Sequence, residues 1–164
     1  ASNMVNLLAG INGLEAGMGI IYSGMLGLYA FTHQRFEAAA IAVVVFTALI
    51  AFFYYNRFPA KILPGDSLTY FLGASLASIA IVGNIEKAAL ICSIPFIMEF
   101  FLKGRSGFKA QSYGSYEEGK VKSSHSKIYS LVHIFTIKPR FTEKQITYSF
   151  ILMEFAFATL IWFV

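Results

Sequence analysis

Charge, aspartate and cysteine are scarce in this sequence of 164 residues. Only 13% of the residues are charged while 57% are hydrophobic, and the mean hydropathy is +0.63. This balance excludes an ordinary soluble globular protein and indicates an integral membrane protein. The single cysteine, Cys92, cannot form a disulfide within the chain, so cysteine usage does not identify the redox compartment. Asp66 is the only aspartate.

The sequence also lacks a cleavable signal peptide and an evident zinc site. No basic region followed by an apolar core opens the chain, and no internal repeat is visible. The chain begins at Ala1 on a polar motif, which predicts that the N-terminal part of a longer protein is missing. His125 and His133 have no cysteine or carboxylate at ligand spacing, which favours surface histidines over a zinc site.

Long apolar runs dominate the rest of the chain. They cover approximately residues 14–32, 37–55, 67–83, 87–102 and 146–164. About 20 apolar residues in a helix cross the hydrocarbon core of a bilayer, and unbroken apolarity argues against the alternating strands of a barrel. The predicted fold class is therefore all-α, a polytopic membrane helix bundle with about five transmembrane helices and one large loop at 103–145.

Basic residues are distributed unevenly between the two predicted membrane faces. Loops 56–66 and 103–145 carry 11 of the 13 lysines and arginines, and only Arg35 and Lys87 lie in the loops opposite. Basic loops stay on the cytoplasmic side, which makes the two larger loops cytoplasmic. Loop 103–145 has two interpretations: simple topology with attraction to anionic lipid, or an electrostatic collar for a multiply charged anion. Its YGSYEEGKVK segment predicts a short hairpin.

Polar residues interrupt the apolar opening stretch NMVNLLAGINGLEAG, residues 3–17. Asn3 and Asn6 are three apart, so on a helix their amides project from one face. Gly10 and the Asn12-Gly13 step predict a sharp turn before helix resumes. Amide oxygens suit a hard cation and the following helix start suits phosphate, but small residues and amides also serve membrane helix packing. Spacing alone leaves both interpretations open.

Asp66 follows the second polar segment, NRFPAKILPGDSLTYFLG, residues 56–73. Two prolines and a Pro-Gly step predict that helix is interrupted between Phe58 and Gly65. Asp66 then stands at a helix start, where an aspartate ordinarily serves as N-cap. The alternative is a site residue, because this segment and the opening motif are predicted at the same membrane level.

Glu99 and Glu154 lie within predicted spans, where an ionised carboxylate needs a partner or water, and Glu15 lies at the start of a predicted span. Glu15 follows the glycine turn, where the helix dipole alone would stabilise it. Glu99 is close enough to the cytoplasmic end to snorkel into water. Glu154 lies at mid-span, so we expect it to face either a lipid groove or another helix.

The two polar motifs together resemble the polyprenyl-phosphate N-acetylhexosamine-1-phosphate transferases of glycosyl transferase family 4. NMVNLLAGINGLEAG and FPAKILPGDSLTYFLG occur in the family's order with one further span between them. The motif LAGINGLEAG is similar to that of the archaeal and eukaryotic dolichyl-phosphate branch of the family. The resemblance covers the whole chain as the C-terminal half of a ten-span enzyme.

The resemblance implies transfer of N-acetylglucosamine-1-phosphate from UDP-N-acetylglucosamine to polyprenyl (dolichyl) phosphate, with release of UMP. It implies that Asn6 and Asp66 hold the catalytic Mg²⁺, for which Mn²⁺ is an alternative, and that Asn3 lies near the same site. One carboxylate and one amide are enough, because Mg²⁺ usually takes few protein oxygens and completes its shell with phosphate and water.

Substrate contacts are also implied by the resemblance. Asn12 and the backbone around Gly10 match the nucleotide-binding turn, and Glu15 belongs to the same motif. The position of Leu63 is aromatic in some relatives and stacks on uracil there. Leucine at this position can give only an apolar contact to uracil. In the basic loop, FLKGRSGFKAQ offers Lys103, Arg105 and Lys109 as cations, and Arg105 is chosen because a guanidinium can hold phosphate bidentately.

The implied partners are the nucleotide sugar, the lipid phosphate, membrane lipid and the missing N-terminal half, with a homodimer as a further option and no nucleic acid. The implied location is an archaeal cell membrane, or the ER membrane, with a cytoplasmic active site. The family's paired aspartates are absent here, so this chain alone is not expected to be a complete enzyme. Two other classes stay open: a transporter using Glu99 and Glu154, and a non-catalytic membrane subunit.

Overall fold

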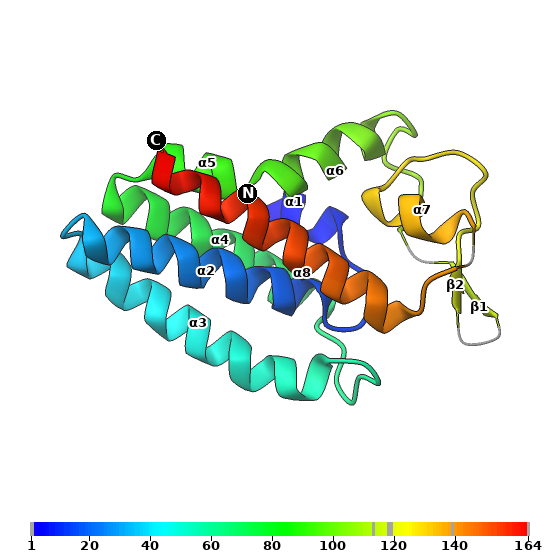
Figure 1. The fold of residues 1–164 in the computed structure, drawn as a ribbon, viewed down its shortest axis with the longest axis horizontal. Helices are drawn as coiled ribbons and strands as arrows, with labels where there is room; N and C mark the ends of the chain where they lie inside the picture. Colours follow the sequence, from blue (N-terminus) through cyan, green and yellow to red (C-terminus); the bar gives the residue numbers. More distant parts are fainter. Residues whose placement is uncertain (1, 113, 118–119, 139, 164) are drawn as a thin grey trace.

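Four long helices form the body of the computed structural model, which describes residues 2–112, 114–117, 120–138 and 140–163. They run along the long axis of the molecule (Figure 1). Within the described residues these four, counting the short 3₁₀ extension η1 (Leu160–Phe163), are the helices long and apolar enough to cross a membrane. The fold is thus an all-α polytopic membrane bundle. The four helices are α2 (Leu14–Thr32), α3 (Phe36–Asn56), α4 (Gly65–Gly83) and α8 (Glu143–Thr159).

The segment predicted as a span at 87–102 is helical but interrupted. It forms α5 (Glu86–Cys92) and α6 (Ile94–Gly104), which meet at Ser93. Pro95 explains the break, because it has no N–H for the carbonyl of Ile91 and its ring crowds that carbonyl. The prediction of one continuous helix there is therefore corrected to two shorter helices in succession.

Helix α2 is the centre of the bundle and contacts α3, α4, α5 and α8. Small residues permit this close packing. A Cβ on Gly17 would lie 2.5 Å from the Ile151 side chain of α8, and one on Gly27 would lie 2.7 Å from Ala42 of α3. Packing through small residues is therefore real in α2, as it is in many membrane bundles.

The opening motif folds as a short helix and a turn. Helix α1 (Ser2–Leu7) packs along α4, and the chain then turns through Gly10 (φ 126°) and Gly13 (φ 78°) into α2. These φ values lie in the region that favours glycine. The predicted turn and the helix start after it are confirmed.

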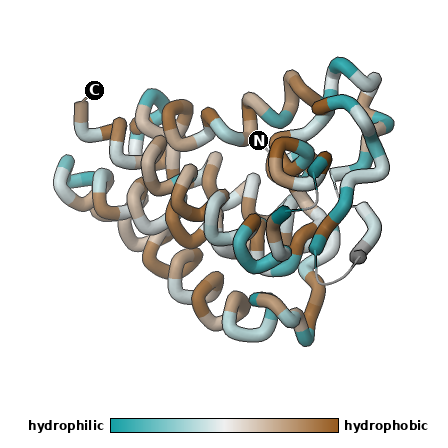
Figure 2. The backbone as a smooth tube through the Cα atoms, turned by 45° about the vertical axis from the view of Figure 1, so that its right-hand side comes forward, coloured by the Kyte–Doolittle hydropathy of each residue, from teal (hydrophilic) through white to brown (hydrophobic). Residues whose placement is uncertain are grey.

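The large loop has structure of its own. Strands β1 (Ser115–Glu117) and β2 (Lys120–Lys122) pair antiparallel, with Ser115 opposite Lys122, which confirms the two strands of the predicted hairpin. The hairpin's Gly119 lies outside the described residues. The sequence did not predict α7 (Leu131–Thr136). Figure 2 shows hydrophilic residues concentrated at the end of the molecule that carries this loop.

Candidate functional site

A cavity of about 580 Å³ opens where α1, α2, α4 and α6 come together with the loop after α6. Its size lies in the range of small-molecule sites. Six of the eight site residues predicted from sequence line it, although they come from two polar motifs that are far apart in the chain. They are Asn6, Gly10, Asn12, Glu15, Leu63 and Asp66.

Asp66 lies in the first turn of α4 and lines this cavity. The helix begins at Gly65 with Pro64 at the N-cap position, and no side chain caps it. Among the described residues, the Asp66 carboxylate has no hydrogen-bond donor from the protein, and the residue is exposed. The interpretation of Asp66 as an N-cap is therefore wrong. Its carboxylate is available to a ligand.

Asn6 is held against the same turn of α4. The Thr69 hydroxyl donates to the Asn6 amide oxygen at 3.0 Å and to the Asp66 backbone carbonyl at 3.0 Å. Thr69 is fully buried, so this bridge fixes α1 to the helix start that carries Asp66. Asn6 and Asp66, 60 positions apart in the chain by their numbering, therefore line one cavity wall.

Glu15 has one engaged and one free carboxylate oxygen. The Gly10 N–H donates to its Oε1 at 2.8 Å, whereas its Oε2 is buried without a partner in the described part of the protein. A buried carboxylate oxygen is costly to leave unpaired, so Oε2 is suited to a cation or a donor from a ligand. Glu15 is thus more than a dipole-stabilised acid.

The donor set fits a hard cation that is shared with substrate. Within the described residues no three His, Cys, Asp or Glu side chains cluster as a metal cage. Mg²⁺ is usually bound through one or two carboxylates together with substrate phosphates, not by an all-protein cage. Asp66, Asn6 and Glu15, which line one cavity, carry oxygen ligands of this kind.

The positive charge of the cavity comes from lysines. Lys103 is only 6% exposed, yet it lines the cavity together with Lys109. Arg105, the basic residue chosen from sequence, is exposed and outside the cavity lining. Asn3 is exposed on α1 and is also outside the lining. Sequence reasoning named Lys103 as an alternative but ranked it below Arg105.

A buried histidine holds the loop after α6 that lines the cavity. His133 Nε2 donates to the Gln111 carbonyl at 2.9 Å, and the Tyr129 N–H donates to His133 Nδ1 at 3.2 Å. These two bonds require the neutral Nε2–H tautomer, because one ring nitrogen faces a donor and the other an acceptor. Ser112 completes the attachment by donating to the Leu7 carbonyl at 3.2 Å.

Two of the sequence interpretations change here, and for Glu154 one of two alternatives is confirmed. His133 is fully buried and so is not a surface histidine. Glu99 is also fully buried, so it does not snorkel; its Oε2 accepts the Leu131 N–H at 2.7 Å and thereby caps α7. Glu154 is buried within the bundle, facing helices and not lipid, and neither of its oxygens has a partner among the described residues. A charge pair at Glu154, which a transporter would need at mid-span, is therefore not found in the described part of the chain.

We expect His133 to make stability depend on pH. Burial lowers the pKa of His133, partly offset by its bond to the Gln111 carbonyl. The folded-state pKa therefore lies below the unfolded value of about 6.5, so the unfolded chain protonates first as pH falls. The stabilisation from neutral His133 is complete above about pH 6.5 and is lost as pH falls below it.

Thermal unfolding of the detergent-purified protein between about pH 7.5 and 5.5 would measure this loss. The melting temperature of wild type should fall more across this interval than that of His133→Gln. The exposed His33→Gln variant is the control and should behave as wild type. Equal pH slopes in wild type and His133→Gln would contradict the assignment.

Comparison with known proteins gives the cavity a context. Residues 1–84, which include α1 to α4, match glycosyl transferase family 4. A Saccharolobus solfataricus protein with the provisional name UDP-N-acetylglucosamine–dolichyl-phosphate N-acetylglucosaminephosphotransferase is 39% identical over 161 residues, 97% of this chain and 50% of that protein. A Sulfolobus acidocaldarius protein of the same provisional name is 34% identical, over 97% of this chain and 49% of that protein.

A further similarity covers fewer residues. The phospho-N-acetylmuramoyl-pentapeptide-transferase of Enterococcus hirae is 42% identical over 98 residues, 60% of this chain and 30% of the enzyme. The chain spans about half the length of the archaeal relatives that it matches. The family match covers more than half of the chain and includes every predicted site residue except Arg105. The chain belongs to glycosyl transferase family 4.

Proposed function

We propose that this chain supplies part of the active site of an enzyme that transfers N-acetylglucosamine-1-phosphate from UDP-N-acetylglucosamine to polyprenyl (dolichyl) phosphate and releases UMP. The observation that carries the proposal is the single cavity shared by Asn6, Glu15, Asp66 and Lys103. The names of the archaeal relatives supply the donor and the acceptor. The chain matches only half of those relatives, so the remaining half is a required partner.

Asp66 and Asn6 are the proposed metal ligands, for Mg²⁺ or alternatively Mn²⁺. The bound ion would neutralise charge on the diphosphate while the lipid phosphate attacks in line. Asp66 supplies the negative charge of the ligand pair and Asn6 a neutral oxygen. The Thr69 hydroxyl restrains the Asn6 amide at 3.0 Å, which fixes the direction of its carbonyl oxygen.

The other cavity residues are proposed to bind the nucleotide sugar. Lys103 and Lys109 face the diphosphate, because they are the cations of the lining. Leu63, which is 73% exposed, offers an apolar contact to the uracil ring. Asn12 and Gly10 form the turn against which the nucleotide lies. Contributions from Asn3 and Arg105 remain predictions from the resemblance.

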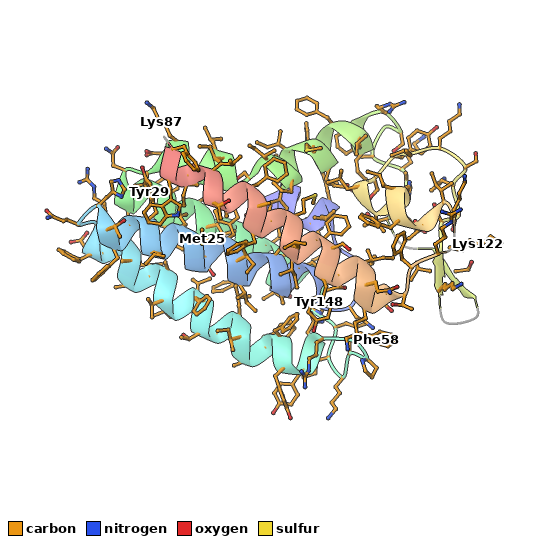
Figure 3. The ribbon with its side chains drawn as sticks, viewed as in Figure 1. Met25, Tyr29, Phe58, Lys87, Lys122 and Tyr148 are labelled. Atoms are coloured by element: carbon orange, nitrogen blue, oxygen red, sulfur yellow. The ribbon has the colours of Figure 1, made fainter. Side chains whose placement is uncertain are left out.

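We place the cavity on the cytoplasmic side because the basic residues gather at its end of the bundle. Lys87 lies at the other end of the molecule from Phe58, Tyr148 and Lys122 (Figure 3). In a Cys92→Ala background, single cysteines at Lys87 and Lys120 should react with a membrane-impermeant reagent from opposite sides. Labelling of both from one side of intact cells would overturn this orientation.

The decisive experiment uses the complete protein of which this chain is part. UMP release should require UDP-N-acetylglucosamine, a polyprenyl phosphate and Mg²⁺ together, and the lipid product should carry the labelled sugar phosphate. Chelation of the metal should stop release, and added Mg²⁺ should restore it. UMP release without the lipid phosphate, or no release with all three present, would refute the proposal.

A further inference from the structure

A second polar cavity, of about 280 Å³, lies between the end of α3 and the start of α8. Three cations line it: Arg57 and Lys61 from the loop after α3, and Lys144 from α8. No aspartate or glutamate is among its lining residues. All three cations are exposed, so the cavity presents concentrated positive charge to whatever lies beside it.

The contacts of these cations leave their charge uncompensated. The Arg57 guanidinium lies 5.1 Å from the centre of the Tyr54 ring, and the Lys144 ammonium lies 6.0 Å from that of Tyr148. Among the described residues none of the three forms an ion pair with a carboxylate. The neighbouring Glu143 accepts the Asn12 N–H through Oε1 at 2.8 Å and forms no ion pair with these cations in the described part of the chain.

The position of this cavity matches the headgroup level of a bilayer. Arg57 directly follows α3 and Lys144 is the second residue of α8, and both helices are candidate spans. Aromatic residues that line the cavity fit the same level, because tyrosines gather at membrane interfaces. Figure 3 shows two of them, Phe58 and Tyr148, near one another at this end of the molecule.

An apolar groove of about 480 Å³ lies further along the same helices. Its lining comes from α2, from α3 and from Phe155 of α8, and it includes Gly24, Val43 and Phe46. Phe53 and Ile151 lie against α2 at Gly17, between this groove and the cationic cavity. A cationic cavity at headgroup level with an apolar groove deeper along α2 is complementary to a lipid with an anionic head.

We propose that an anionic phospholipid binds here, its phosphate among Arg57, Lys61 and Lys144 and an acyl chain along the groove between α3 and α8. The site lies outside the catalytic cavity, although Asn12 lines both. Free phosphate would use the cations but not the groove. A lipid with a choline headgroup would meet no carboxylate in the lining to hold its positive end.

Native mass spectrometry of the complete protein in a neutral detergent would test the proposal, with dioleoylphosphatidylglycerol and dioleoylphosphatidylcholine as probes. Wild type should prefer phosphatidylglycerol. A basic residue near an anionic lipid contributes about fivefold in affinity, so Arg57→Gln/Lys144→Gln should bind it about 25-fold more weakly. The control, Lys120→Gln/Lys127→Gln, removes equal charge from exposed positions outside the cavity and should bind as wild type.

Two further arms identify the ligand. Val43→Trp would fill the groove from an exposed position and should weaken phosphatidylglycerol binding while the cations stay intact. Excess inorganic phosphate should not displace the lipid. The proposal would be overturned if phosphate displaced the lipid or if Arg57→Gln/Lys144→Gln bound phosphatidylglycerol as wild type does. It would also be overturned if wild type showed no lipid preference because another protein segment covers the groove.

Discussion

Asp66→Asn in the complete enzyme is expected to lower turnover by roughly 10² to 10³. The substitution keeps size and hydrogen bonding but removes the only aspartate of the chain from the cavity. Electrostatic stabilisation of a transition state by such a group is commonly worth about 3 to 4 kcal/mol, which gives this range. Asn6→Ala should cost less, because water can partly replace a neutral ligand.

Folding should be unaffected by Asp66→Asn. The side chain caps nothing in α4 and is exposed, so no structural bond is lost. Ser67→Ala is the matched control, since Ser67 is exposed in the same helical turn but outside the cavity lining. UMP release at saturating Mg²⁺ measures turnover, and detergent-phase size exclusion checks folding. Near-normal turnover by well-folded Asp66→Asn would remove Asp66 from the metal site.

Much of this architecture follows from local features of the sequence. The predicted span 14–32 has the bounds of α2, because Gly13 interrupts the helix before it and a long apolar run follows. The approach of Asn6 to Asp66 follows from two polar motifs that meet at one membrane level. Pro95 is the one residue in segment 87–102 that indicates a helix break. The prediction of a single span there used only the apolar run and so did not include the break.

Other features depend on contacts between distant residues. Helix α7 has six residues, too few to be stable from its own sequence. It is held by Glu99, 32 positions before Leu131, and by the His133 bond to Gln111, 22 positions away. No local sequence pattern indicates contacts between residues so far apart, which is why His133 was expected at the surface. The same limit applies to Glu99, whose partner lies in another segment.

The preference for Arg105 over Lys103 is reversed by the burial of Lys103, which the structure shows and the sequence does not. Glu99 and Lys103 are four apart on α6, so they share a face, whereas Arg105 directly follows the helix. Glu99 and Lys103 are both buried, which identifies their shared face as the inner face of α6. A charged residue buried on the inner face of a helix and lining a cavity is a better phosphate-binding candidate than an exposed guanidinium.

Lys103→Met in the complete enzyme is therefore expected to lower turnover by about 10², because it removes a cation that the cavity wall holds in place against the diphosphate. Arg105→Met removes the same charge two residues away and should change turnover less than about twofold, since an exposed charge is screened by solvent. Lys109→Met should fall between them. UMP release would measure turnover. Loss of Lys103 would leave the buried Glu99 without a neighbouring cation, so thermal unfolding would show whether a loss of turnover comes from destabilisation. If Arg105→Met lost as much activity as Lys103→Met or more, the diphosphate would be held by the arginine and the cavity wall would have a different role.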